Sequence, residues 1–173
     1  MKSIAYRLFM LCLIPLYGCG VYSFTGASIS PDVKTISIQT FFNNAPLGPS
    51  EMSAVFTENI KDYFQQNTSL TLVDDDGDLQ FDGYIDNYTI TPVGANASGR
   101  SNTADFSELS RVTITVFATY TNKTDDTFDF EKRFTFFKDV PQDEDISTLE
   151  EEIMNEVFEQ IIIDIFNASV ANW

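Results

Sequence analysis

Apolar and polar residues alternate in five stretches of the 173-residue chain, which is the pattern of half-buried β-strands. The predicted strands cover residues 34–41, 70–73, 79–90, 112–120 and 128–136. In the third strand the alternation changes phase near Asp86 and Asn87, so we expect a β-bulge there. Residues 122–126 join the last two strands into the clearest hairpin that the pattern predicts.

Two further stretches have apolar residues three or four positions apart, which is the spacing of an amphipathic helix. The first helix is predicted over 50–66, with Ser50 as its N-cap. The second is predicted from 147 to about 167. Ser147 and Glu150 have the spacing of a capping box at its start, and an apolar stripe follows.

The resulting order, β-α-β-β-β-β-α, predicts an α+β fold. We expect a two-layer sandwich in which one mainly antiparallel or mixed sheet carries both helices on one face. Residues 91–108 connect the third and fourth strands and are rich in Gly, Asn and Ser. Connections of this length are often functional or mobile. The sequence shows no internal repeat, so a single domain is predicted.

The first residues have the pattern of a secretory signal peptide. Lys2 and Arg7 precede the apolar run 8–16, and Gly18 and Cys19 follow it. A small residue before a cysteine is typical of a bacterial lipidation motif, so we expect cleavage before Cys19 and lipid on Cys19. This divides the chain into a signal peptide (1–18), a lipidated tether (19–32) and one domain (33–173). The alternative is an ordinary signal peptide in which Cys19 carries no lipid.

Acidic residues outnumber basic residues by 26 to 10, which gives a net charge of −16. Removal of Lys2 and Arg7 with the signal peptide would make this −18. Such a charge argues against nucleic acid as a ligand, because its phosphates need a basic surface. It also argues against broad electrostatic binding to anionic lipid, so the membrane is expected to hold the protein only through its N-terminal lipid.

Catalytic and metal-binding chemistry finds little support in the sequence. The chain has no histidine, the usual general base and zinc ligand, and Cys19 is the only cysteine after the signal peptide. The acidic stretch 74–78 has the composition of a calcium loop. The EF-hand spacing, however, would place Leu72 and Gly83 where carboxylates are needed. We therefore predict no enzyme, no metal and no cofactor.

Two aromatic residues, Phe117 and Phe137, are out of phase with the core pattern of their strands. One interpretation is an exposed apolar patch that binds a partner. The other is that both rings pack beneath a loop.

Six stretches, taken in order, resemble one known family. They are residues 33–38, 41–44, 56–64, 70–73, 78–85 and 111–116. Together with the motif at Cys19, the series resembles the LptE family of lipopolysaccharide-assembly lipoproteins, in the form found in Bacteroidetes. The resemblance covers nearly all of the mature chain, and it rests on the ordered series rather than on any single motif.

The resemblance implies the same fold and a non-enzymatic role. LptE-type lipoproteins sit inside the lumen of LptD, a large outer-membrane β-barrel. They help that barrel to assemble and help to deliver lipopolysaccharide to the outer leaflet. The implied partners are therefore an LptD-type barrel and lipopolysaccharide, and the implied location is the periplasmic side of the outer membrane. Residues 20–24 lack the acidic cluster that resembles a surface-export signal in this phylum, which favours the same side.

Direct contact with lipopolysaccharide is expected at cations near loops, because lipid A phosphates are anionic. The predicted ligand-binding residues are Arg100, Arg111 and Lys138. The competing interpretation is that Arg100 is solvated and that Arg111 pairs with a carboxylate such as Glu108. A second function also stays open: a lipid-anchored protein that binds a glycan or peptide and shares only the sandwich fold.

Overall fold

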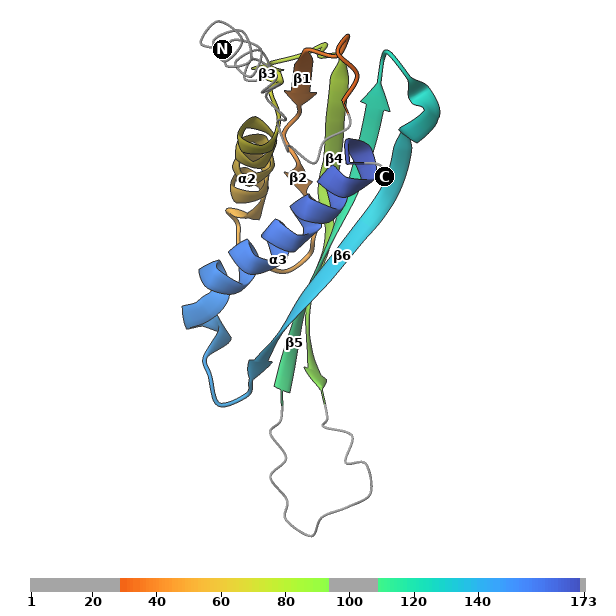
Figure 1. The fold of residues 1–173 in the computed structure, drawn as a ribbon. Coiled ribbons are helices and arrows are strands. Elements are labelled where there is room, and N and C mark those ends of the chain that lie inside the picture. Colours follow the sequence, from red (N-terminus) through yellow and green to blue (C-terminus); the bar gives the residue numbers. More distant parts are fainter. Residues whose placement is uncertain (1–28, 94–108, 172–173) are drawn as a thin grey trace, which may run out of the picture.

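The computed structural model describes residues 29–93 and 109–171 (Figure 1). Cys19 and Arg100 lie outside the described residues. The elements are β1 (Thr35–Ile38), β2 (Phe42–Asn43), α2 (Met52–Asn67), β3 (Thr71–Val73), β4 (Leu79–Val93), β5 (Leu109–Asn122), a 3₁₀ helix (Asp126–Phe128), β6 (Phe130–Pro141) and α3 (Ile146–Ser169). The predicted α+β class is confirmed, and β2 is a short strand that the pattern did not predict.

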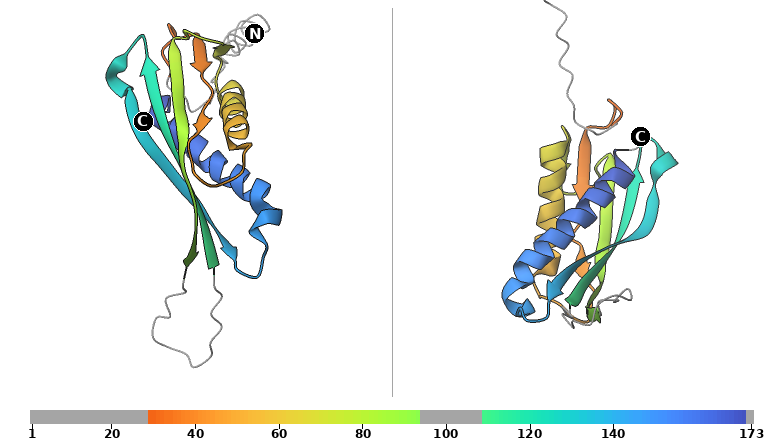
Figure 2. Two further views of the ribbon diagram at one scale, coloured as in Figure 1. Left: turned by 180° about the vertical axis from the view of Figure 1, so that it is seen from behind. Right: turned by 60° about the horizontal axis from the view of Figure 1, so that its bottom comes forward.

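One mixed sheet contains all the strands, in the order β3-β1-β4-β5-β6, with β2 beside β4. β1 runs parallel to β3 and β4, whereas β4, β5 and β6 form an antiparallel meander. The predicted bulge is confirmed, since the register of β4 against β5 shifts between Ile85 and Asn87. Both helices cover one face of the sheet, and the view from behind shows the strands of the other face (Figure 2). We call that uncovered side the open face.

Aromatic side chains hold the two layers together. Phe56 of α2 makes edge-to-face contacts with both Phe41 and Phe158, with 5.0 Å between ring centroids in each pair. All three rings are fully buried. Edge-to-face pairs of this kind add about 0.5–1.5 kcal/mol to the stabilisation from burial alone. The chain of rings therefore links the sheet edge, α2 and α3 into one core.

Hydrogen bonds from α2 fix the strand edge at Phe41. The Phe41 amide donates to the hydroxyl of Thr57 at 3.0 Å, and the Ser53 hydroxyl donates to the Phe41 carbonyl at 2.7 Å. Ser53 and Thr57 lie one helical turn apart, so the two hydroxyls reach one residue. The buried backbone groups of Phe41 are satisfied in this way, although no strand pairs with them.

Three local predictions were wrong. Asp145, rather than Ser147, caps α3: its side chain accepts from the Ser147 amide at 3.0 Å. Ser50 does not cap α2, because residue Glu51 occupies the cap position and makes no side-chain cap bond. Phe128 belongs to the 3₁₀ helix instead of the last strand, and it is 48% exposed. Thus α2 and the last strand begin later than the apolar pattern indicates, whereas α3 begins earlier.

Candidate functional site

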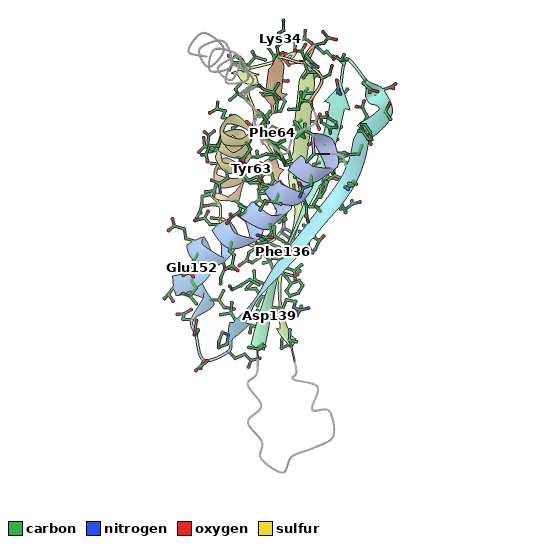
Figure 3. All side chains as sticks on the ribbon, in the orientation of Figure 1. Lys34, Tyr63, Phe64, Phe136, Asp139 and Glu152 are labelled. Carbon is green, nitrogen blue, oxygen red and sulfur yellow. The ribbon has the colours of Figure 1, made fainter. Side chains whose placement is uncertain are left out.

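The two predicted ligand cations that the structure describes lie on opposite faces of the sheet. Arg111 and its register neighbour Asp139 point to the open face. Lys138 is paired in register with the buried residue Val112 and reaches the helix layer. Figure 3 shows Asp139 at one end of the sheet, far from Lys34 at the other end. Arg111 and Lys138 therefore do not converge on one site.

Arg111 is held rigidly on the open face. Its Nε and Nη2 atoms donate to the two carboxylate oxygens of Asp139 at 2.7 and 2.8 Å. Its guanidinium carbon lies 3.7 Å from the ring centre of Phe137. The hydrogen bonds from Arg111 lower the pKa of the Asp139 carboxyl. Arg111 thus pairs with a carboxylate, as the competing interpretation expected, and that carboxylate is Asp139; Glu108, the residue given as an example, lies outside the described residues.

The open face is defined by the outward side chains of three long strands together with Phe42. The members are Phe42 of β2; Asp82, Tyr84, Asn87, Thr89 and Thr91 of β4; Arg111, Thr113, Thr115, Phe117 and Thr119 of β5; and Glu131, Arg133, Thr135, Phe137 and Asp139 of β6. Both helices lie on the other side of the sheet (Figure 2). Threonine is the commonest residue among them and five of the sixteen side chains are charged, so the face is largely polar.

An aromatic row crosses the open face from strand to strand. Phe42 is paired in register with Tyr84, and Tyr84 with Phe117. The rings of Tyr84 and Phe117 stack, with 5.1 Å between their centroids and 24° between their planes. Phe42 is 67% exposed, the largest value among the exposed apolar residues of the described chain. The row is therefore preformed and accessible at one end.

Arg133 closes the other end of this row. It is paired in register with Phe117, and its guanidinium carbon lies 5.5 Å from that ring centre. Its Nε donates to a carboxylate oxygen of Asp86 at 2.7 Å. Asp86 sits at the bulge, so the irregular strand turns this carboxylate toward β6. Arg111 and Arg133 thus form two similar units, each with one aromatic ring and one aspartate.

The opposite side of the molecule is strongly acidic. Residues 142–169, which include α3, contain nine acidic residues and no basic residue. Lys138 reaches this layer and donates to both carboxylate oxygens of Glu156 at 2.7 and 2.6 Å. Glu152 lies on α3 near its N-terminal end (Figure 3). The α3 side and the open face therefore differ in charge: residues 142–169 carry only acidic charges, whereas the open face combines arginines with carboxylates.

The acidic turn 74–78 has a structural role. The Asp78 carboxylate accepts from the amides of Lys34 and Thr35 and from the Thr35 hydroxyl, each at 2.9 Å. The Lys34 amide, followed by the Thr35 groups, lowers the pKa of Asp78. Asp78 therefore joins the start of β1 to the start of β4. Within 29–93 and 109–171 no three His, Cys, Asp or Glu side chains are grouped closely enough to hold a metal ion.

A cavity of about 360 Å³ opens at the end of the sheet where the described chain begins. Ile29, Tyr120, Asp125, Phe128 and Ser169 are among its lining residues. Burial raises the pKa of Tyr120 to about 12, so its phenol is neutral at physiological pH. The lining combines a neutral phenol, small hydroxyls and one exposed carboxylate. We find no paired acid and base in it that would support catalysis.

Sequence reasoning found part of the open face. Phe117 and Phe137 were singled out by their phase, and both lie on it. They belong to different cross-strand rows, because the pair Thr115 and Thr135 lies between them. The contributions of Phe42, Tyr84 and Arg133 were missed. Phe42 could not be placed without the short strand β2, and the bulge changes the phase just beyond Tyr84.

Comparison with known proteins identifies related sequences and folds. A family model described as "LptE: Lipopolysaccharide-assembly" matches residues 33–169. No curated protein matches the sequence significantly. The fold is similar to that of an uncharacterized lipoprotein B from Nitrosomonas europaea, with a TM-score of 0.55, 10% identity, and coverage of 86% of this chain and 88% of that chain.

A second similar structure is a hypothetical protein from Chlamydia trachomatis. It has a TM-score of 0.52 and 10% identity, over 81% of this chain and 99% of that chain. At such low identity these likenesses concern the fold alone. Among the residues that the structure describes, no helix is long and apolar enough to cross a membrane.

Proposed function

Because the chain belongs to the LptE family of lipopolysaccharide-assembly proteins, we propose that it is an outer-membrane lipoprotein that helps to assemble, and plugs, an LptD-type β-barrel. In this role it helps to deliver lipopolysaccharide to the outer leaflet and catalyses no reaction. The observation that carries the proposal is the family match over 33–169, a range that contains every described strand and helix.

The surface of the domain suits the polar lumen of a barrel. Only five large apolar residues of the described chain are well exposed: Phe42, Leu47, Ile90, Phe128 and Phe137. They are scattered over several elements and form no continuous apolar band. A domain of this kind can fill a water-lined interior without needing contact with lipid tails.

The proposal includes a lipid anchor at Cys19. Each buried CH₂ group contributes about 0.8 kcal/mol to membrane binding, and stable anchoring needs two or more acyl chains. We expect the purified membrane form to be heavier than the Cys19–Trp173 polypeptide by a diacylglycerol group, usually with a further acyl chain. An intact mass equal to that of the bare polypeptide would remove the anchor from the proposal.

The test of the barrel assignment is depletion combined with co-purification. Depletion of the protein should lower the amount of correctly assembled barrel in the outer membrane. The tagged, full-length protein should co-purify with that barrel from detergent-solubilised membranes. Normal barrel assembly after depletion, with no barrel in the eluate, would refute the proposal and favour the glycan- or peptide-binding alternative.

Contact between lipopolysaccharide and Arg100, Arg111 or Lys138 is part of the proposal. Arg111 and Lys138 already bind the carboxylates of Asp139 and Glu156. A lipid A phosphate must therefore displace a carboxylate from either cation. Because such an exchange replaces one partly exposed ion pair by another, we expect these two contacts to orient the ligand more than they strengthen its binding.

A further inference from the structure

We propose that the open face is the surface of the plug that packs closely against the protein wall of the barrel partner, and that the acidic α3 layer faces the water-filled part of the lumen. This inference rests on the proposed function for the identity of the partner. The choice of face comes from the composition, charge and dimensions of the two sides of the sheet.

The aromatic residues and arginines of the open face are typical of a protein-binding surface. Such surfaces are enriched in aromatic residues and Arg and depleted in Lys, and their hot spots are commonly Tyr, Trp and Arg. The open face holds four aromatic side chains and both arginines of the described chain, but no lysine. The described lysines all lie elsewhere. Lys138, for example, reaches Glu156 on α3.

The key side chains of this face are already held in place before any partner binds. Arg111 is fixed by Asp139 and Phe137, and Arg133 is fixed by Asp86 and lies beside Phe117. Immobilising a free, rotamer-rich side chain on binding costs about 0.5–1.5 kcal/mol. Because these arginines have lost much of that freedom in the folded monomer, the face is preorganised for a rigid partner.

Charge on this face indicates the chemistry of the partner. Asp82, Thr119 and Glu131 form a cross-strand row directly beside the aromatic row. Asp82 and Glu131 are exposed, and neither forms an ion pair with another described residue. The matching surface is therefore an apolar patch for the aromatic row, bordered by Lys or Arg side chains that meet Asp82 and Glu131.

The size of the open face is sufficient for such contact. β5 has 14 residues and spans about 45 Å at roughly 3.4 Å per residue. Three strands at about 4.8 Å spacing give a width of about 15 Å. The resulting area of roughly 700 Å² is close to the ~800 Å² that each partner contributes to a standard interface.

Site-specific photo-cross-linking tests the orientation in intact cells. A photoreactive residue replaces Thr135, which is exposed midway along β6 on the open face, or Glu152, which is exposed on α3. We expect a cross-link to the barrel from position 135 at several times the yield from position 152. Equal yields, or a higher yield from position 152, would overturn the inference. A main product containing a second copy of the chain, or lipopolysaccharide, would also overturn it.

Charge reversal provides a second, matched test. The double variant Asp82→Lys/Glu131→Lys should reduce barrel co-purification at least tenfold. The control Glu151→Lys/Glu152→Lys makes the same change in charge on α3 and should leave it within twofold. Equal loss in both variants contradicts the choice of face. If the first variant does not fold, the cross-linking result decides. Failure of the unmodified protein to co-purify with the barrel would instead refute the proposed function, and this inference with it.

Discussion

The substitution Gly83→Ala tests how closely β4 and β5 pack at this position. Strand propensity alone predicts that alanine stabilises the protein, whereas the packing at Gly83 predicts that it destabilises the protein. Alanine in a strand interior is ordinarily more stable than glycine by about 0.5–1 kcal/mol. At Gly83 an added Cβ would lie 2.1 Å from the Phe117 carbonyl oxygen and 2.6 Å from a ring carbon of Phe41. Close carbon–oxygen contacts in sheets are about 3.3 Å or longer. The Phe117 backbone would therefore have to move by about 1 Å.

The Phe117 carbonyl oxygen, which obstructs the added Cβ, determines whether the substitution stabilises or destabilises the protein. Phe117 lies in β5 between β4 and β6, so its carbonyl cannot move without disturbing two strand pairings. Overpacking at a well-packed position costs about 1–3 kcal/mol. Because this exceeds the gain from strand propensity, we expect a net destabilisation of about 1–2 kcal/mol. The midpoint of thermal unfolding should fall by about 2–8 °C, given roughly 2–4 °C per kcal/mol for domains of this size.

Urea unfolding followed by far-UV circular dichroism measures the effect. The matched control is Asp82→Ala, at the exposed neighbouring position of the same strand, which should change the free energy of unfolding by no more than about 0.5 kcal/mol. A Gly83→Ala protein as stable as wild type, or more stable, would refute the argument. It would mean that β4 and β5 are not packed as closely at Gly83 as described.

Three other outcomes are expected. Asp78→Asn should destabilise the protein near neutral pH; because its pKa is lowered in the fold, the difference from wild type should shrink below about pH 4 in urea titrations. Asp145→Ala should lower the thermal midpoint more than Ser147→Ala does, since Asp145 accepts the capping hydrogen bonds of α3. A larger decrease for Ser147→Ala would instead support Ser147 as the cap. Arg100→Glu/Lys138→Glu should weaken lipopolysaccharide binding with unchanged circular dichroism, and unaltered binding would exclude these cations.

The sequence predicted the regular parts of the fold because their signals are local and repeated. The apolar alternation of β5, from Val112 to Tyr120, is unbroken, and every second residue there is buried. The phase change in β4 was visible for the same reason, since a bulge moves all later apolar residues to the other parity. The sequence could not supply the parallel pairing of β1 with β4, because strand order depends on long-range contacts.

The arrangement of the candidate site depends on such long-range contacts. Phe42, Tyr84, Phe117 and Arg133 come from four strands, and they form a row only because the register aligns them. Arg111 and Lys138 illustrate the converse. Both were chosen as cations beside loops. Arg111 lies opposite Asp139 on the open face, whereas Lys138 precedes Asp139 by one residue and therefore faces the helices. A one-residue difference in strand parity is enough to separate two charges by the thickness of the sheet.

The separation of charge between the layers bears on how so acidic a chain can work beside an anionic glycolipid. Nine acidic residues lie in 142–169, on and next to the helix that covers the other face. At physiological ionic strength the Debye length is about 8 Å, while packed layers lie about 10 Å apart. A partner on the open face therefore interacts mainly with the local charges there, where Arg111 and Arg133 offset two aspartates and Asp82 and Glu131 stay unpaired within the described chain. The strongest repulsion of anionic groups is confined to the helical side, so it does not oppose docking of the open face against the barrel wall.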